Sequence, residues 1–181
     1  MVIPLFLLAF TSGALMKLTD DISEGILNVN RIIGVILGIA YGAVLALTIR
    51  MYVVIIPIYL AILISVIATG KIDSYEHGIA TALIVINLML MGIRIKRCML
   101  IPLVMFMISG VIDEIGNDLS DKGKIKGMFS LIFRYRLVLE ITTLLYSVIS
   151  KDYTQWLFLV GLDSGYIASS FIIKNSLVHT F

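Results

Sequence analysis

Two short stretches of this chain bring carboxylates together at the same spacing. They read "SGALMKLTDDISEG" (12–25) and "SGVIDEIGNDLSDK" (109–122). On a helix, residues three or four positions apart share a face, with about 5–6 Å between their Cβ atoms. The acid pairs that result are Asp21 with Glu24 and Asp118 with Asp121. Such pairs repel one another unless a cation neutralises them. Hard oxygen ligands suit Mg²⁺, so the two stretches predict magnesium chemistry.

The predicted site takes its side chains from both stretches and from the cations beside them. The expected metal ligands are Asp20, Asp21, Glu24, Asn117, Asp118 and Asp121. We expect Asp21 and Asp118 to be the catalytic carboxylates. Mg²⁺ commonly binds through one or two carboxylates together with the phosphates of a substrate. The cations expected to hold those phosphates are Lys17, Lys122, Lys124, Lys126, Arg134 and Arg136. A lipid-linked or prenyl (di)phosphate is the predicted substrate, because an apolar bundle would hold its hydrocarbon tail.

The composition predicts that membrane helices position these residues. The chain has 181 residues, of which 60% are hydrophobic and only 14% are charged, against about 25% charged in soluble domains. Its apolar runs approach the roughly 20 residues that a helix needs to cross a bilayer. We therefore predict an all-α, polytopic transmembrane bundle of about seven spans, within a range of six to eight. The expected spans are 2–18, 32–49, 51–69, 78–94, 98–114, 127–149 and 153–173.

The two acidic stretches also predict an internal duplication. At an offset of 97 residues, Ser12, Gly13, Asp21 and Ser23 recur as Ser109, Gly110, Asp118 and Ser120. A single membrane domain over 1–181 would then contain repeat halves 1–95 and 96–181. Four spans separate the two motifs, so the halves would run parallel and both motifs would face one compartment. In this topology nine of the fourteen Lys and Arg residues lie on the motif side. The positive-inside rule makes that side cytoplasmic, with the N-terminus outside a multi-pass cell-membrane protein.

The arrangement resembles that of UbiA-type intramembrane prenyltransferases, which carry two Asp-rich motifs on cytoplasmic helix ends. "NDLSD" (117–121) looks like the first part of their N-D-x-x-D-x-x-x-D pattern, and "DDISE" (20–24) is a looser version. The resemblance implies Mg²⁺ as cofactor and a prenyl diphosphate as substrate. The pattern departs at Ile125, where the family has a third Asp, and this chain is shorter than those enzymes.

Two other classes of function stay open. A cation or small-solute transporter built from parallel repeats would use acids within the membrane, and the candidates are Asp113, Asp163 and Asp73. A membrane aspartyl protease similar to the prepilin peptidases would pair Asp20 with Asp73. Here "DDISEGILN" and "GKID" resemble that family's D-x5-I-P-N and G-x-G-D motifs, with Leu27 in place of the Pro and Ile72 in place of the second Gly.

Several other features favour a structural interpretation. We interpret His77, near a loop, as an ordinary surface residue, and Gly34, Gly38 and Gly42 as a helix-packing stripe. The single Cys98 excludes an intramolecular disulfide. A net charge of +2, without a soluble region, makes no case for nucleic-acid binding.

Overall fold

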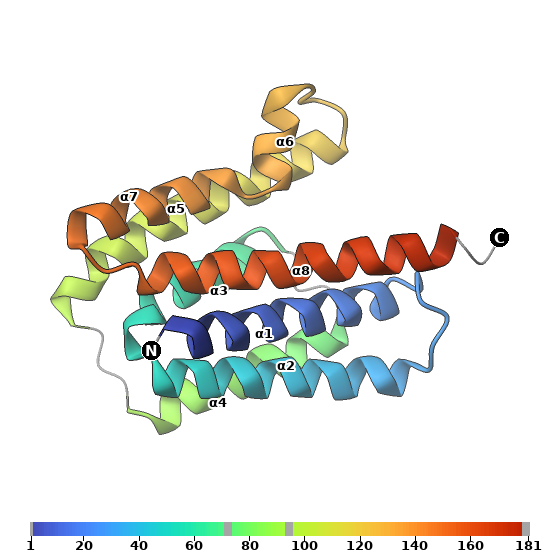
Figure 1. The fold of residues 1–181 in the computed structure, drawn as a ribbon, viewed down its shortest axis with the longest axis horizontal. Helices are drawn as coiled ribbons and strands as arrows, with labels where there is room; N and C mark the ends of the chain where they lie inside the picture. The colour runs from blue at the N-terminus through green and yellow to red at the C-terminus, as the bar shows by residue number, and fades with distance from the viewer. Residues whose placement is uncertain (1, 71–73, 93–95, 179–181) are drawn as a thin grey trace. The chain divides into compact units, whose positions relative to one another are not determined.

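All secondary-structure elements are helices in the part of the chain that the computed structural model describes, which is residues 2–70, 74–92 and 96–178 (Figure 1). In chain order the elements are α1 (Val2–Ser23), α2 (Arg31–Met51), the 3₁₀ turn η1 (Val53–Ile55), α3 (Ile56–Ala68), α4 (Tyr75–Leu90), α5 (Arg97–Asp121), α6 (Met128–Arg134), α7 (Leu137–Ser150) and α8 (Thr154–Val178). These ranges contain no β-strand. The prediction of an all-α fold is therefore confirmed.

Four of the helices are long and apolar enough to cross a bilayer. They are Val2–Ser23, Arg31–Met51, Arg97–Asp121 and Thr154–Asn175. Three shorter apolar helices are Val53–Ala68, Tyr75–Leu90 and Leu137–Ser150. These apolar helices are compatible with an integral membrane protein in a lipid bilayer. The predicted count of seven spans is not confirmed, because the three shorter helices fall below the roughly 20 residues that span the hydrocarbon core.

The helix expected over 127–149 is two helices rather than one. The break between α6 and α7 lies at Arg136, whose left-handed backbone (φ 51°) takes the chain out of the helical conformation. A carboxylate from α5 stabilises the start of α7. Asp113 of α5 accepts hydrogen bonds from the backbone N–H groups of Val138 (3.3 Å) and Leu139 (2.7 Å). These donors have no partner within their own helix, so Asp113 caps α7 from α5.

The helices form two units, each of which takes residues from both expected repeat halves, 1–95 and 96–181. Unit 1 comprises 1–53, 73–93 and 157–181, and unit 2 comprises 54–72 and 94–156. In unit 1, α2 packs against both α1 and α4. In unit 2, α5 packs against α3, α6 and α7. The internal duplication stays a prediction.

Glycine lets the helices of unit 1 approach at backbone distance. A Cβ atom added at Gly13 of α1 would lie 1.9 Å from the carbonyl oxygen of Leu162 in α8. A Cβ atom at Gly165 of α8 would lie 2.0 Å from the carbonyl oxygen of Phe10. The predicted packing role of the stripe on α2 also holds, since a Cβ atom added at Gly38 would lie 2.7 Å from the carbonyl oxygen of Glu76 in α4. Small residues at such crossings allow the close van der Waals packing that associates helices in lipid.

Replacing a crossing glycine by alanine tests this packing. We expect Gly13→Ala and Gly165→Ala each to lower the free energy of unfolding by about 1–3 kcal/mol, the usual range for overpacking. Gly78→Ala is the matched control, because its Cβ would meet nothing within 4 Å. Thermal unfolding in detergent, followed by circular dichroism, measures the difference. Equal midpoints for Gly13→Ala and Gly78→Ala would contradict the close crossing of α1 and α8.

Candidate functional site

Asp20 is the best-defined carboxylate of the predicted site and lies near the C-terminal end of α1, in unit 1. Its Oδ1 lies 2.5 Å from Nε2 of His77, and its Oδ2 accepts a hydrogen bond of 2.7 Å from the hydroxyl of Tyr166. The side chains of Asp20 and His77 remain 22% and 16% exposed. Asp20 is therefore held in one orientation while it keeps access to its surroundings.

His77 connects Asp20 to the interior of unit 1. The second ring nitrogen of His77, Nδ1, lies 2.5 Å from the hydroxyl of Tyr41, which is only 4% exposed. An ionised carboxylate can only accept hydrogen bonds, so Nε2 carries the proton when Asp20 is charged, and a neutral ring then accepts from Tyr41 at Nδ1. The resulting hydrogen-bonded chain of side chains runs from Tyr41 through His77 to Asp20, and Tyr166 is the other donor to Asp20. It uses one side chain from each of α2, α4, α1 and α8.

The local sequence explains why His77 reaches this position. Ser74 is the N-cap of α4 and its side chain accepts a hydrogen bond from the backbone N–H of His77 (3.3 Å). The cap fixes the first turn of α4, on which His77 is carried. The interpretation of His77 as an ordinary surface residue is therefore wrong. The signal in the sequence is the capping pattern "SYEH" before an apolar run, but the partners of His77 come from distant segments.

The other two acids of the first stretch have different surroundings. Asp21 is 2% exposed and forms an ion pair of 2.8 Å with Lys17, one turn earlier on α1. The ammonium group of Lys17 also lies 5.2 Å from the ring centroid of Tyr166, within cation–π range. Glu24 is exposed in the turn after α1. Lys17 therefore lies beside the Asp20 site, where the prediction puts a phosphate-binding cation.

Glu76, next to His77, is a fully buried carboxylate (0% exposed). Its Oε1 accepts a hydrogen bond of 2.8 Å from Nε of Arg31, whose own side chain is 71% exposed. Within the described part of the chain, Oε2 of Glu76 has no hydrogen-bond partner. Arg31 also lines an open pocket of about 490 Å³ with Ile32, Val35 and Tyr75.

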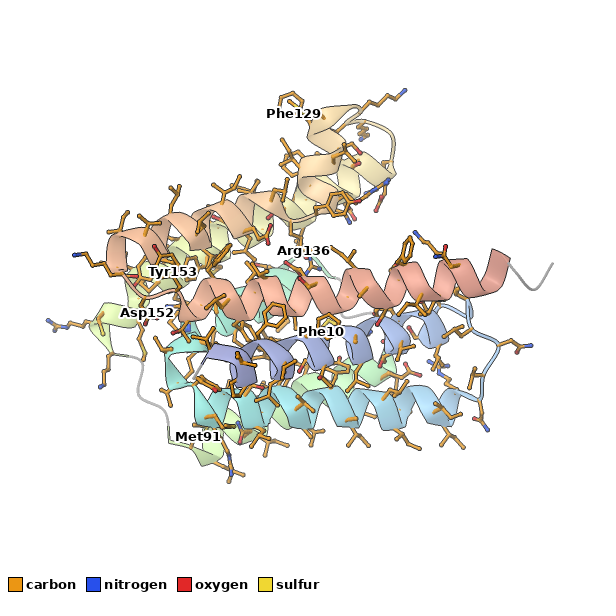
Figure 2. The ribbon with its side chains drawn as sticks, in the orientation of Figure 1. Phe10, Met91, Phe129, Arg136, Asp152 and Tyr153 are labelled. Carbon is orange, nitrogen blue, oxygen red and sulfur yellow. The ribbon has the colours of Figure 1, made fainter. Side chains whose placement is uncertain are left out.

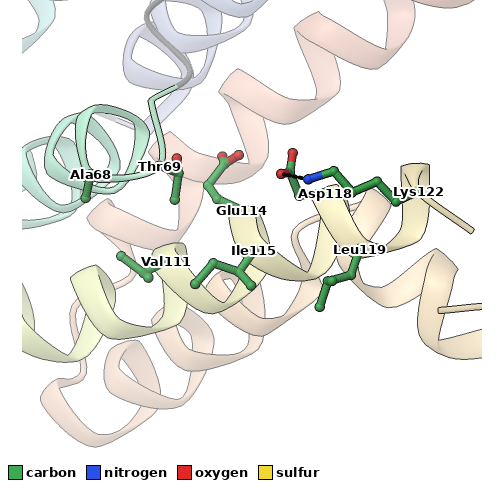
Figure 3. A pocket seen from close by; sticks show the side chains of 8 residues that line it. All are labelled: Ala68, Thr69, Val111, Glu114, Ile115, Asp118, Leu119 and Lys122. Atoms are coloured by element: carbon green, nitrogen blue, oxygen red, sulfur yellow. Dashed lines mark hydrogen bonds and ion pairs between the residues drawn. The ribbon is translucent and has the colours of Figure 1, made fainter. Parts of the chain in front are cut away.

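The second acidic stretch lies in unit 2 and borders a pocket of about 340 Å³ (Figure 3). Its charged lining residues are Glu114, Asp118 and Lys122, and Asp118 forms an ion pair of 3.1 Å with Lys122. Glu114, which is buried, forms an ion pair of 3.0 Å with Arg136. Lys122 and Arg136, two of the predicted phosphate-binding cations, thus each lie beside a carboxylate.

The remaining predicted residues are more dispersed. Asn117 donates a long hydrogen bond of 3.5 Å to Asp121 on the exposed end of α5, and the exposed cations Lys124, Lys126 and Arg134 follow it. Asp163 lies on α8 between Gly161 and Gly165, which both face α1. Asp73 lies outside the described residues. In the ranges that the structure covers, no three His, Cys, Asp or Glu side chains are grouped as they would be to hold a metal ion.

The two acidic stretches belong to different units, with Asp20 and Asp21 in unit 1 and Asp118 and Asp121 in unit 2. Their convergence on one cation stays a prediction. Searches against known protein families, curated proteins and solved structures found no match to this chain. The chemistry of the site therefore has to be inferred from its own residues.

Removing the hydroxyl of Tyr41 tests the hydrogen-bonded chain. Tyr41→Phe leaves Nδ1 of His77 without its partner, and we expect the free energy of unfolding to fall by about 1–3 kcal/mol, the desolvation penalty of a buried polar group. Tyr75→Phe is the matched control, because Tyr75 is 68% exposed and begins α4, the helix that carries His77. The midpoint of thermal unfolding in detergent measures both variants. A Tyr41→Phe protein as stable as Tyr75→Phe would contradict the bond.

Proposed function

We propose that this chain is an integral membrane enzyme that acts on a lipid-linked phosphate, with Asp20 as its catalytic carboxylate. The observation that carries the proposal is the clamp on Asp20 formed by His77 (2.5 Å) and Tyr166 (2.7 Å). A carboxylate held by fixed donors is pre-organised for binding or catalysis, because its rotamer is already set. The flanking Lys17 and the apolar helices suit a phosphate joined to a hydrocarbon tail.

The donor set at Asp20 is compatible with Mg²⁺. Each carboxylate oxygen can accept two interactions, and His77 and Tyr166 use one on each oxygen. Carboxylates that bind metals are usually held by hydrogen bonds of this kind. A bound Mg²⁺ would supply Lewis-acid polarisation of a phosphoryl oxygen. His77 and Tyr166 would orient Asp20, and the ammonium group of Lys17 can donate to a phosphate oxygen as well as to Asp21.

A fuller version of the proposal adds the second acidic stretch. Asp118, Asp121 and Asn117 would supply further oxygen ligands, and prenyl transfer would be the reaction. This version requires the two units to bring their acidic ends together at one membrane surface. Within the first stretch, Asp20 is better suited than Asp21 to be the catalytic acid, because Asp21 is buried and paired with Lys17.

Asp20→Asn tests the central claim. We expect release of diphosphate from a prenyl diphosphate, measured in detergent with Mg²⁺, to fall by about 100-fold or more, as on loss of a positioned charged group. Asp152→Asn is the control, because Asp152 caps α8 through a bond of 3.0 Å to the N–H of Thr154 and asparagine caps equally well. Full activity in Asp20→Asn would refute the proposal.

Asp118→Asn separates the two versions. If both stretches share one cation, this variant should lose activity as Asp20→Asn does, while its helix content by circular dichroism stays unchanged. If Asp118→Asn keeps the activity and Asp20→Asn loses it, the site is confined to unit 1 and the fuller version fails.

A proton-coupled transporter is the second candidate. The observation that favours it is the hydrogen-bonded chain from buried Tyr41 through His77 to Asp20, because imidazole can exchange protons near neutral pH. Transport predicts solute flux driven by a pH gradient in liposomes, without turnover of a prenyl diphosphate. The aspartyl-protease hypothesis requires Asp73 beside Asp20 and stays a prediction.

A further inference from the structure

The C-terminal end of α5 extends beyond the start of α7, which packs against it in unit 2. Asp113 caps the first turn of α7, so α7 begins at the level of Asp113. From there α5 continues to Asp121, which is about 12 Å at 1.5 Å per residue. The whole of α5 has 25 residues, or about 37 Å, whereas the hydrocarbon core is about 30 Å thick. The charged end of α5 therefore reaches the membrane–water boundary.

α6 folds back onto this extension and is held there. A Cβ atom at Gly116 of α5 would lie 2.2 Å from the ring of Phe133 in α6, so the ring packs directly on the backbone of α5. One turn further along, the hydroxyls of Ser120 and Ser130 are hydrogen-bonded. We call residues 114–136 the α5–α6 hairpin. These contacts make it an ordered element rather than a loose connection.

The hairpin presents large apolar side chains that no described part of its own unit covers. Met128 is 74% exposed, Phe129 is 64% exposed, and Leu131 and Tyr135 are each 49% exposed. Figure 2 shows Phe129 at the outer edge of α6. Side chains of this kind on a helix that lies along a membrane insert into the boundary between headgroups and acyl chains.

The same hairpin carries an excess of positive charge. Its five cations are Lys122, Lys124, Lys126, Arg134 and Arg136, and its three acids are Glu114, Asp118 and Asp121, which leaves a net charge of +2. Glu114 and Asp118 are each paired with a cation. Lys124, Lys126 and Arg134 form no ion pair with any residue that the structure describes, and all three are exposed. Clustered Lys and Arg beside a membrane helix attract anionic lipid headgroups.

We propose that the α5–α6 hairpin is a binding surface for anionic lipid headgroups of the bilayer in which the chain is embedded. Its apolar side chains enter the lipid, and Lys124, Lys126 and Arg134 contact the phosphates. Continuity with α5 selects lipid as the occupant, because the hairpin directly continues a helix long and apolar enough to span the membrane. The inference stands independently of the enzyme proposal, which rests on Asp20 in unit 1.

A fluorescent probe at the apolar face tests this surface. The chain has a single tryptophan, Trp156, so Phe129→Trp in a Trp156→Phe background reports on the hairpin alone. The protein is placed in phosphatidylcholine vesicles that also contain phosphatidylglycerol, and either lipid is supplied in brominated form at equal mole fraction. We expect brominated phosphatidylglycerol to quench the fluorescence at least about twofold more strongly, because clustered cations enrich anionic lipid around them.

The charge variant Lys124→Gln/Lys126→Gln/Arg134→Gln should remove this excess quenching. The matched control is Lys96→Gln/Arg97→Gln at the other end of α5, where both residues are exposed and the excess should remain. Equal quenching by the two lipids in the parent protein, quenching by neither, or an excess that survives the charge variant would each overturn the proposal. A second measurement needs no fluorescent probe and keeps both Trp156 and Phe129. In mixed micelles, phosphatidylglycerol should raise the unfolding midpoint of the parent protein more than it raises that of the charge variant.

Discussion

Polar groups near membrane helices have to find their partners inside the protein, because hydrocarbon offers no water to solvate them. Three polar contacts in the two units illustrate this constraint. Asp113 accepts hydrogen bonds from the N–H groups at the start of α7. Asp21 forms an ion pair with Lys17, and buried Glu76 forms one with the exposed Arg31. Two of these three contacts join different helices, since Asp113 of α5 contacts α7 and Glu76 of α4 contacts Arg31 of α2. At the start of α7, the pairing with Asp113 also supports the helix end.

Close packing by glycine is what allows the partners in unit 1 to meet. Where α1 and α8 cross, their backbones touch at Gly13 and Gly165. That crossing brings Tyr166 within 2.7 Å of Asp20. The close approach of α2 and α4 at Gly38, where an added Cβ atom would lie 2.7 Å from the carbonyl oxygen of Glu76, puts Tyr41 beside His77. A larger residue at these crossings would separate the helices, and the hydrogen-bonded chain through Asp20 would lose its donors. The packing of the bundle and the chemistry of the site therefore depend on the same positions.

The two acidic stretches are similar in sequence, but their side chains have different surroundings. Aligned Asp21 and Asp118 both pair with a lysine one turn away, yet Asp21 is buried and Asp118 is about half exposed. The tyrosine and histidine partners belong to Asp20, whose counterpart in the alignment is Asn117. Unit 1 thus holds a carboxylate oriented by a histidine and a tyrosine, on which the proposed phosphate chemistry depends. Unit 2 holds the charged and apolar hairpin that we propose binds lipid headgroups.

The amino-acid sequence by itself determined the class of this protein. Composition and the length of the apolar runs depend only on local residue content, so they predicted an all-α chain with helices able to span a membrane. The glycine stripe on α2 could be predicted in the same way, because helical periodicity puts i and i+4 on one face. Only the tertiary structure decided which polar residues meet. His77 finds Asp20 and Tyr41, and Asp113 caps α7, through contacts between segments 25 to 57 residues apart, which no local pattern records. The break at Arg136 was decided there as well, because it depends on a capping carboxylate supplied by another helix.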